Sequence, residues 1–230
     1  MPSVEKLMHF LSSAIINAAG AAVLAFGMST YWAESTLRCA STNDDFSNGT
    51  AFLKITLFNG TEDKIACPRF DKLGEYVEVF NRLQKHGQGP IVLHGLVVAL
   101  LAVALFGSVG SILITLYNSF SNPYQTYMGP VGLYACSGLS ASVATLALIL
   151  FVLNVYPLQM FQALVLAQES DVKLENVKTD LHAGFFLLIP YICANLFAIL
   201  IVFLYVHIAQ TRRKEQEKPT EDAPQDIMMF

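Results

Sequence analysis

The stretch Asn118-Ser-Phe-Ser-Asn-Pro-Tyr-Gln-Thr-Tyr-Met-Gly-Pro130 divides the longest uncharged part of this chain. That part, residues 86–168, contains no Asp, Glu, Lys or Arg. It is far too long for one membrane crossing, which needs about 20 apolar residues. Two prolines, a glycine and several polar residues in the quoted stretch predict a turn. The sequence therefore predicts a transmembrane hairpin with spans at 90–117 and 130–156.

Two further uncharged runs, residues 7–31 and 181–211, are each long enough for one more crossing. The chain is 54% hydrophobic and 14% charged, whereas an average soluble domain carries about 25% charged residues. A cleaved signal peptide is the alternative for the first run, but its apolar core would have about 7–15 residues. We therefore expect an all-α membrane protein, a single four-span domain over residues 1–230, folded as a bundle of four transmembrane helices.

The spans leave a first extracellular loop at 32–89, a cytoplasmic loop at 118–129, a second extracellular loop at 157–180 and a cytoplasmic tail at 212–230. Two glycosylation patterns, at Asn48 and Asn59, favour the extracellular side for the first loop. Arg212-Arg-Lys214 directly follows the last span and predicts a cytoplasmic C-terminus. Four crossings put both termini on one side, so we expect a multi-pass plasma-membrane protein with both termini cytoplasmic.

The loops also carry local patterns. Residues 51–58 are rich in β-formers and precede Asn-Gly, which predicts a strand running into a turn. Residues 71–86 have apolar side chains at three-to-four spacing and predict a helix. Residues 161–166 are apolar and are expected to extend the third span.

The first and last spans each carry a residue with a structural meaning. Tyr31 and Trp32 end the first run and are expected to mark the headgroup boundary, which these side chains favour. Pro190 falls in the first third of the last span and predicts a kink, because proline removes a backbone hydrogen bond.

The four cysteines form two groups. Cys39 and Cys67 lie in a polar segment, whereas Cys136 and Cys193 lie in apolar runs. This pattern suits one disulfide in an oxidising compartment and two inert membrane cysteines.

Small residues recur four apart in the second and third spans: Gly107 and Ser111 in one, Gly132, Cys136 and Ser140 in the other. In lipid, such residues let helix backbones approach closely. We expect these faces to pack the bundle internally, and a homo-oligomer that uses one of them is the alternative. Asn17 and Asn195 are expected to form hydrogen bonds between helices.

The spans contain no acid and no base stronger than histidine, which disfavours an ion pathway. Hydrolase and metal-binding patterns are missing from the sequence, so we expect no enzyme, no catalytic residue, no metal and no cofactor. A formal charge of −4 argues against nucleic acid as a partner.

The expected partners are therefore the lipid bilayer and membrane or scaffold proteins. The chain ends in Met228, Met229 and Phe230 after an acidic tail. Hydrophobic side chains at the last position and two before it, with a free carboxylate, suit a PDZ-type groove. An uninvolved tail is the alternative.

The chain resembles the clarin family. The resemblance is sharpest in Tyr117-Asn-Ser-Phe120, Asn122-Pro-Tyr-Gln-Thr126 and Gly129-Pro-Val-Gly-Leu-Tyr134, and extends to Leu57-Phe-Asn-Gly60. It implies a small four-span glycoprotein distantly related to claudins, with a small β-sheet in the first extracellular loop. It also implies that Trp32 and a Cys39–Cys67 disulfide correspond to the Trp and the disulfide in that loop of the related proteins.

These observations favour a non-enzymatic accessory or scaffold protein that organises membrane partners and the cortical cytoskeleton. A sensory-cell role follows from the resemblance alone. The alternatives are a claudin-like adhesion or barrier protein and an auxiliary subunit of a channel.

Overall fold

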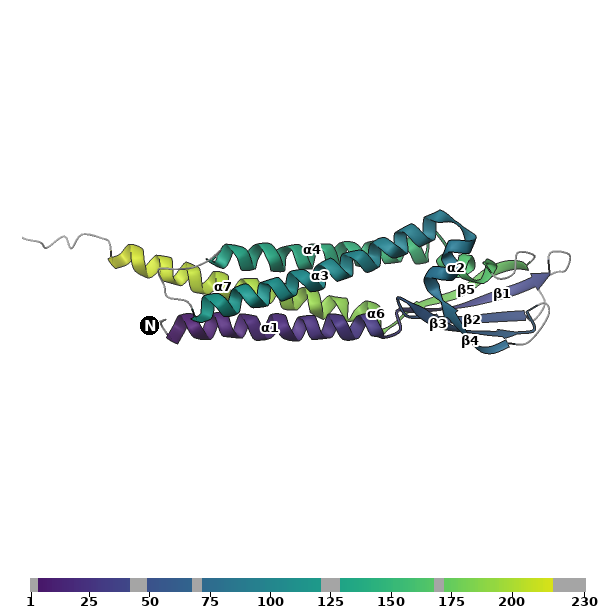
Figure 1. Ribbon diagram of the computed structural model, residues 1–230, viewed down its shortest axis with the longest axis horizontal. Helices are drawn as coiled ribbons and strands as arrows, with labels where there is room; N and C mark the ends of the chain where they lie inside the picture. The colour runs from purple at the N-terminus through teal and green to yellow at the C-terminus, as the bar shows by residue number, and fades with distance from the viewer. Residues whose placement is uncertain (1–3, 42–48, 68–71, 121–128, 168–171, 217–230) are drawn as a thin grey trace, which may run out of the picture.

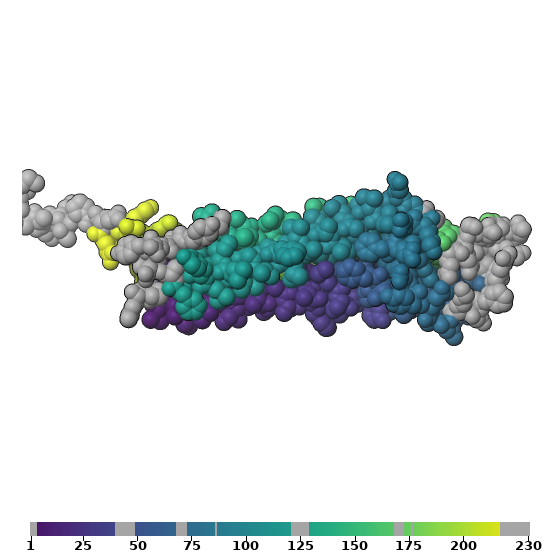
Figure 2. Space-filling view, viewed as in Figure 1, coloured from purple at the N-terminus to yellow at the C-terminus, as the bar shows by residue number. Residues whose placement is uncertain are grey.

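The computed structural model describes residues 4–41, 49–67, 72–120, 129–167 and 172–216. Four long helices lie side by side along the molecule, and a twisted antiparallel sheet caps one end of them (Figure 1). In the space-filling view, bundle and sheet form one continuous surface on this side (Figure 2). The described ends of the first and last helices lie together at the end opposite the sheet (Figure 1).

Four helical segments are long and apolar enough to cross a membrane. They are α1 (Val4–Ser29), α3 (Gln88–Phe120), α4 (Gly129–Val155) and the pair α6 (Ala183–Phe186) and α7 (Leu188–Gln216). Their outward side chains are large and apolar, for example Phe106, Leu113 and Phe203, as lipid requires. The predicted four-helix membrane bundle is confirmed. A helix end does not mark a bilayer surface, so the span limits stay predictions.

The break between α6 and α7 has a local cause. Pro190 has no N–H to donate to the carbonyl of Phe186, the residue four positions before it and the last of α6. Leu187 therefore lies in a turn, and the chain resumes as α7 at Leu188. The interruption predicted from Pro190 falls at this point.

The sheet contains five strands in the order β4-β3-β2-β1-β5, and all its pairings are antiparallel. The strands are β1 (Ala33–Ser41), β2 (Gly49–Ile55), β3 (Asn59–Ile65), β4 (Lys72–Glu78) and β5 (Val172–Leu181). Burial alternates along the strands, so one face packs against helices and the other is open. The sheet implied by the family resemblance is thus present.

The predicted strand and turn after residue 51 are confirmed in β2 and the residues that follow it. Thr56 holds the turn: its backbone N–H donates to the Asn59 carbonyl at 2.7 Å. The Thr56 hydroxyl also donates to the Asn59 side-chain oxygen at 2.9 Å. Asn59 and Gly60 then open β3.

Two helix predictions were wrong. Residues 71–86 do not form one helix, because β4 takes the first half and pairs with β3, and only α2 (Val79–His86) is helical. The backbone groups of β4 form hydrogen bonds with β3, although the sequence pattern alone favoured a helix. Residues 161–166 do not extend α4 either. They belong to a separate helix, α5 (Met160–Leu166), because α4 ends at Val155 before Pro157, and Gln159 has a left-handed φ of 50°.

The expectation for Trp32 also needs correction. Tyr31 is 41% exposed, as a boundary residue would be, but Trp32 is completely buried. Its ring packs edge-on against Phe151 at 5.0 Å, and its Nε1–H donates to the Gly27 carbonyl at 2.9 Å. Trp32 therefore lies in the joint between bundle and sheet.

Candidate interaction site

We call the five strands together with α2 and α5 the sheet module. Its disulfide joins Cys39, near the end of β1, to Cys67, after β3, across a Cα–Cα distance of 5.5 Å. Both cysteines are buried. The predicted disulfide is therefore present, and it ties β1 to the end of β3, on either side of the central strand β2, at the end of the sheet farther from the bundle (Figure 1).

Three backbone hydrogen bonds connect the sheet module to the bundle at Trp32. The Trp32 N–H donates to the Ile55 carbonyl, and the His182 N–H donates to the Trp32 carbonyl, both at 2.8 Å. The Gly184 N–H donates to the Tyr31 carbonyl at 2.8 Å. Gly184 is required here, since a Cβ at this position would lie 2.5 Å from Trp32 Cδ1. β1 and β5 are thus joined directly to the first and last membrane helices.

A third connection runs from α3 to the turn between β2 and β3. His94 is completely buried, and its Nε2 lies 2.7 Å from the Leu57 carbonyl. The Phe80 ring of α2 lies 5.1 Å from the His94 ring and stacks on Phe58 at 6.4 Å. The sheet module therefore has one fixed position on the bundle.

The sheet module contains a buried cluster of charges. Glu62 on β3 is 0% exposed, and its carboxylate accepts a hydrogen bond from Arg82 of α2 at 2.5 Å. Arg82 also donates to Glu75 of β4 at 3.3 Å, and Lys64 Nζ lies 3.6 Å from Glu62 Oε1. Because an unpaired buried charge is costly, this cluster fixes the position of α2 on the sheet.

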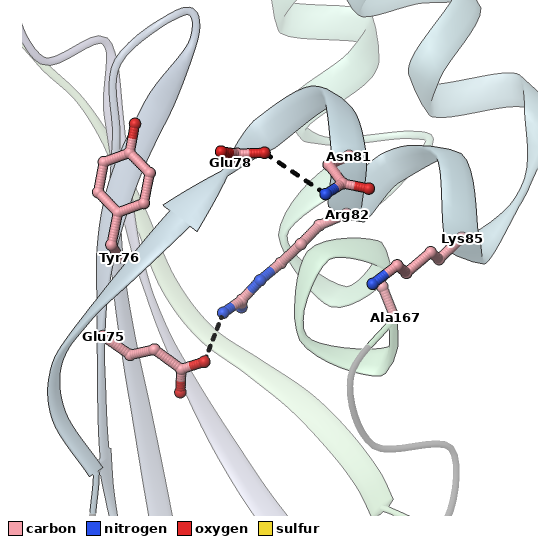
Figure 3. A pocket seen from close by; sticks show the side chains of 7 residues that line it. All are labelled: Glu75, Tyr76, Glu78, Asn81, Arg82, Lys85 and Ala167. Atoms are coloured by element: carbon pink, nitrogen blue, oxygen red, sulfur yellow. Dashed lines mark hydrogen bonds and ion pairs between the residues drawn. The ribbon is translucent and has the colours of Figure 1, made fainter.

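A cavity of about 370 Å³ opens beside this cluster, between β4 and α2 (Figure 3). From β4 it is lined by Glu75, Tyr76 and Glu78. From α2 it is lined by Asn81, Arg82 and Lys85, and Ala167 closes it on the α5 side.

Two charges of this polar pocket remain for a ligand or partner. Arg82 points toward Glu75 and is already engaged by two carboxylates (Figure 3). Glu78 makes one 3.4 Å hydrogen bond with Asn81, and Lys85 lies on the pocket's other side (Figure 3). A carboxylate and an ammonium on opposite sides suit a polar partner segment that carries both signs of charge.

In the bundle, one polar side chain from each of three helices meets at the centre. Asn17 of α1 donates to Ser111 of α3 at 3.0 Å and to Ser137 of α4 at 3.4 Å. The two serine hydroxyls lie 2.7 Å apart. All three residues are completely buried. The expected role of Asn17 between helices is therefore seen in the structure.

Asn195 of α7 behaves differently from Asn17. Its amide donates to the Tyr191 carbonyl of its own helix at 3.0 Å, not to another helix. Tyr191 makes the contact between helices instead: its hydroxyl lies 2.7 Å from Ser108 of α3 and donates to the Ala104 carbonyl at 2.9 Å.

The residues chosen for helix packing lie as follows. A Cβ at Gly107 would overlap the Ser140 hydroxyl, which itself donates to the Ala104 carbonyl at 3.1 Å. The carbonyl of Cys136 also faces Gly107, and Gly132 is buried on α4. These positions thus bring α3 and α4 together.

The structure describes only part of the other predicted sites. Asn59 is half-buried at the start of β3, and the side chain of Thr61 in its glycosylation pattern is exposed. Asn48 and the C-terminal Met228, Met229 and Phe230 lie outside the described residues. Within the described ranges, no three His, Cys, Asp or Glu side chains are placed to hold a metal ion.

Sequence reasoning missed the Glu62–Arg82 cluster and the strand β5. Glu62 and Lys64 were a signal for the cluster. They are two residues apart on a strand, so these opposite charges lie on the same face, and that face is buried. The prediction for residues 157–180 was only a second extracellular loop, whose residues 173–180 carry four charged side chains. Only the pairing with β1 reveals β5.

Comparison with known proteins shows relatives that match from end to end. The chain is 34% identical to Clarin-3 of Mus musculus, 30% identical to Clarin-3 of Homo sapiens and 32% identical to Clarin-3 of Rattus norvegicus. Each alignment covers 100% of both sequences. No family model matches the chain.

Proposed function

This chain belongs to the clarin family, and from that premise we propose that it is a non-enzymatic accessory protein of the plasma membrane. In this role it organises membrane partners and connects them to the cortical cytoskeleton. The sheet module contacts the partner outside the cell, and the C-terminal Met228, Met229 and Phe230 dock in a PDZ-type groove inside it.

The polar pocket between β4 and α2 carries this proposal. Within the described residues Glu78 and Lys85 form no ion pair, and Glu78 accepts only a 3.4 Å hydrogen bond from Asn81, while Arg82 beside them is held by Glu62 and Glu75. Arg82 is held in place by two carboxylates and forms a fixed base of the pocket. Binding there costs less entropy, because this side chain is already ordered. The pocket is thus a suitable contact for a polar segment of a membrane partner.

The bundle supports a scaffolding role over transport. The central polar residues Asn17, Ser111 and Ser137 are used in contacts between helices. An ion pathway needs charged or hydrated groups along a crossing, and these hydroxyls and amides are enclosed by helices. The bundle is therefore best suited to hold the sheet module in a defined position at the membrane surface.

The proposed orientation has the sheet module outside and both termini inside. It follows from Arg212, Arg213 and Lys214 at the end of α7 and from the glycosylation patterns at Asn48 and Asn59. Glycosidase treatment should increase gel mobility, and Asn48→Gln with Asn59→Gln should abolish that increase. Unchanged mobility of the wild-type chain would count against this orientation.

The test of the partner role is proximity labelling in a polarised epithelial line, with the labelling enzyme fused to the N-terminus so that the C-terminal carboxylate stays free. The variants are Glu78→Lys and Lys85→Glu in the pocket, and Arg38→Glu as a charge-matched control on the open face of β1. We expect both pocket variants, but not the control, to lose the same set of membrane proteins. If all three variants label the same membrane proteins as the wild type, the pocket is not the partner contact.

Deletion of Met228, Met229 and Phe230 tests the inner docking peptide in the same cells. We expect the loss of scaffold and actin-linked proteins, with the membrane set unchanged. Enrichment of junction strand proteins that does not depend on the tail would instead favour the claudin-like adhesion role.

A further inference from the structure

The strand β5 forms one edge of the sheet. The strand order puts β1 on one side of it, and within the described residues no strand pairs with its other side. β5 is ten residues long, whereas the opposite edge strand, β4, has seven and contains Gly74 with a left-handed φ of 69°. The Thr179 carbonyl accepts a 3.3 Å hydrogen bond from the Tyr156 hydroxyl. The other backbone groups of a long edge strand can pair with a further strand.

The register with β1 shows which face of β5 each charge occupies. Leu37 and Cys39 of β1 point into the core, so Arg38 between them points to the open face. Opposite Arg38 on β5 is Glu175, and two positions along, opposite Ala40, is Lys173. Both Lys173 and Glu175 are exposed and share this open face.

A bulge keeps the remaining charges of β5 on the same face. Leu37 pairs with Asn176 and Thr36 pairs with Lys178, so Val177 is an extra residue in the ladder. After it, Lys178 faces Thr36 and Asp180 faces Glu34, both outward. Without the bulge, these two charges would point to the opposite face from Lys173 and Glu175.

The open face of β5 therefore carries, in order, Lys173, Glu175, Lys178 and Asp180, with alternating sign. A second β5 that runs antiparallel puts Asp180 opposite Lys173 and Lys178 opposite Glu175. Every position then meets the opposite charge. A second β5 that runs parallel can offer the same free edge only after a half-turn about the strand axis, which puts its charges on the opposite face of the joined sheet, so the two sets of charges do not meet.

We propose that β5 binds the β5 strand of a second copy of this chain in a facing membrane. The strands run along the long axis of the bundle (Figure 1), so an antiparallel copy points its helices in the opposite direction. Two copies in one membrane point their strands the same way, so their charged faces lie on opposite sides of the joined sheet and gain no charge pairing. The strand pairing thus joins two bilayers, and ten residues at about 3.3 Å each put the two sheet–bundle joints about 33 Å apart.

The charges are available for this exchange. Lys178 Nζ contacts Asp180 Oδ2 at 2.6 Å within one copy, and the two side chains are 70% and 43% exposed. The hydrogen bond that Lys178 donates to the Asp180 carboxylate raises the pKa of Lys178, so the ammonium is charged at neutral pH. On pairing, Lys178 gains the partner's Glu175 without leaving solvent-accessible surroundings.

Charged edge strands also serve to prevent pairing. Charges of one sign would oppose each other in the antiparallel orientation, and charges scattered over two faces would weaken the pairing. Here the signs alternate, and the bulge gathers all four on one face. The pattern therefore favours the antiparallel orientation, in which every charge meets the opposite sign.

The test uses the full chain reconstituted in liposomes that carry one of two dyes. The reversed variant contains Lys173→Glu, Glu175→Lys, Lys178→Glu and Asp180→Lys, so it matches itself but opposes the wild type. Clustering of the two dye populations is measured by energy transfer. The control variant is Lys214→Glu with Glu215→Lys, which likewise keeps the net charge and lies at the far end of α7.

We expect wild type with wild type, and reversed with reversed, to cluster. Wild type with reversed should cluster roughly tenfold more slowly, because every opposed pair then carries like charge. The control variant should cluster with the wild type as the wild type does with itself. Clustering of the two matched pairs also shows that the reversed variant folds.

Equal clustering in the mixed pair, or none between wild-type liposomes, would overturn the proposal. This inference does not depend on the partner role of the polar pocket. Loss of partners in the Lys85→Glu cells would leave liposome clustering unchanged, and the converse also holds, so the two proposals fail separately.

Discussion

Arg82 and Glu62 form an ion pair between α2 and the sheet, with 2.5 Å between a guanidinium nitrogen and a completely buried carboxylate oxygen. Glu62 lies on β3 and Arg82 on α2, the helix that follows β4. The pair therefore holds α2 against the sheet beside the cavity. The polar pocket therefore depends on a charge pair inside the module.

Arg82→Met should strongly destabilise the sheet module, because it leaves the Glu62 charge buried beside Lys64 alone. We expect a loss of about 3–5 kcal/mol. The measurement is thermal unfolding of the purified protein in detergent, followed by size-exclusion chromatography. The double variant Glu62→Leu with Arg82→Met should recover part of the loss, and a double variant as unstable as the single one would contradict this account.

Gly184→Ala should loosen the joint between bundle and sheet, because the new methyl group would meet the Trp32 ring. Overpacking of this kind costs about 1–3 kcal/mol. Gly138→Ala is the matched control, since nothing lies within 4 Å of a Cβ there. Gly184→Ala should have a lower midpoint of thermal unfolding than Gly138→Ala. Equal midpoints would show that the residues around Trp32 move to accept the methyl group.

Asn17→Leu should weaken the bundle, because it removes the donors to Ser111 and Ser137. Hydrogen bonds between membrane helices contribute about 0.6–2 kcal/mol. Ser142→Ala provides the comparison, since that hydroxyl is exposed and bonds only within α4, to the Gly138 carbonyl. Denaturation in mixed micelles would measure both, and a larger effect at Ser142 would refute the role of Asn17.

Cys39→Ser with Cys67→Ser should lower stability by about 3 kcal/mol, the usual gain from closing a loop of this length. The two positions are 28 residues apart in sequence. Cys193→Ser should have no effect, because that thiol is free and exposed on α7. Thiol labelling of the unreduced, denatured wild type should modify Cys136 and Cys193 but not Cys39.

The bundle could be predicted from the sequence because lipid imposes one strong rule, about 20 apolar residues for each crossing. Uncharged runs on both sides of residues 118–130 therefore revealed four helices. The small residues of α3 and α4 were recognisable for the same reason, since close helix contact needs Gly107 or its equivalent.

The sheet module was harder to predict, because its pattern depends on partners far along the chain. β4 has apolar residues at helical spacing, and only pairing with β3 makes it a strand. β5 lies more than 130 residues after β1, and its residues were predicted only as part of a loop. The Glu62–Arg82 pair likewise required the fold to bring β3 under α2.

The joint at Trp32 has a mechanical consequence. β1 continues from α1 after three residues, and β5 continues into α6 after one, while the two strands pair along their length. A sideways load on the tip of the sheet is therefore divided between the first and last helices of the chain. The sheet module is thus anchored to the bundle through two helical segments at once. Torque applied to the module turns α1 and α7 together.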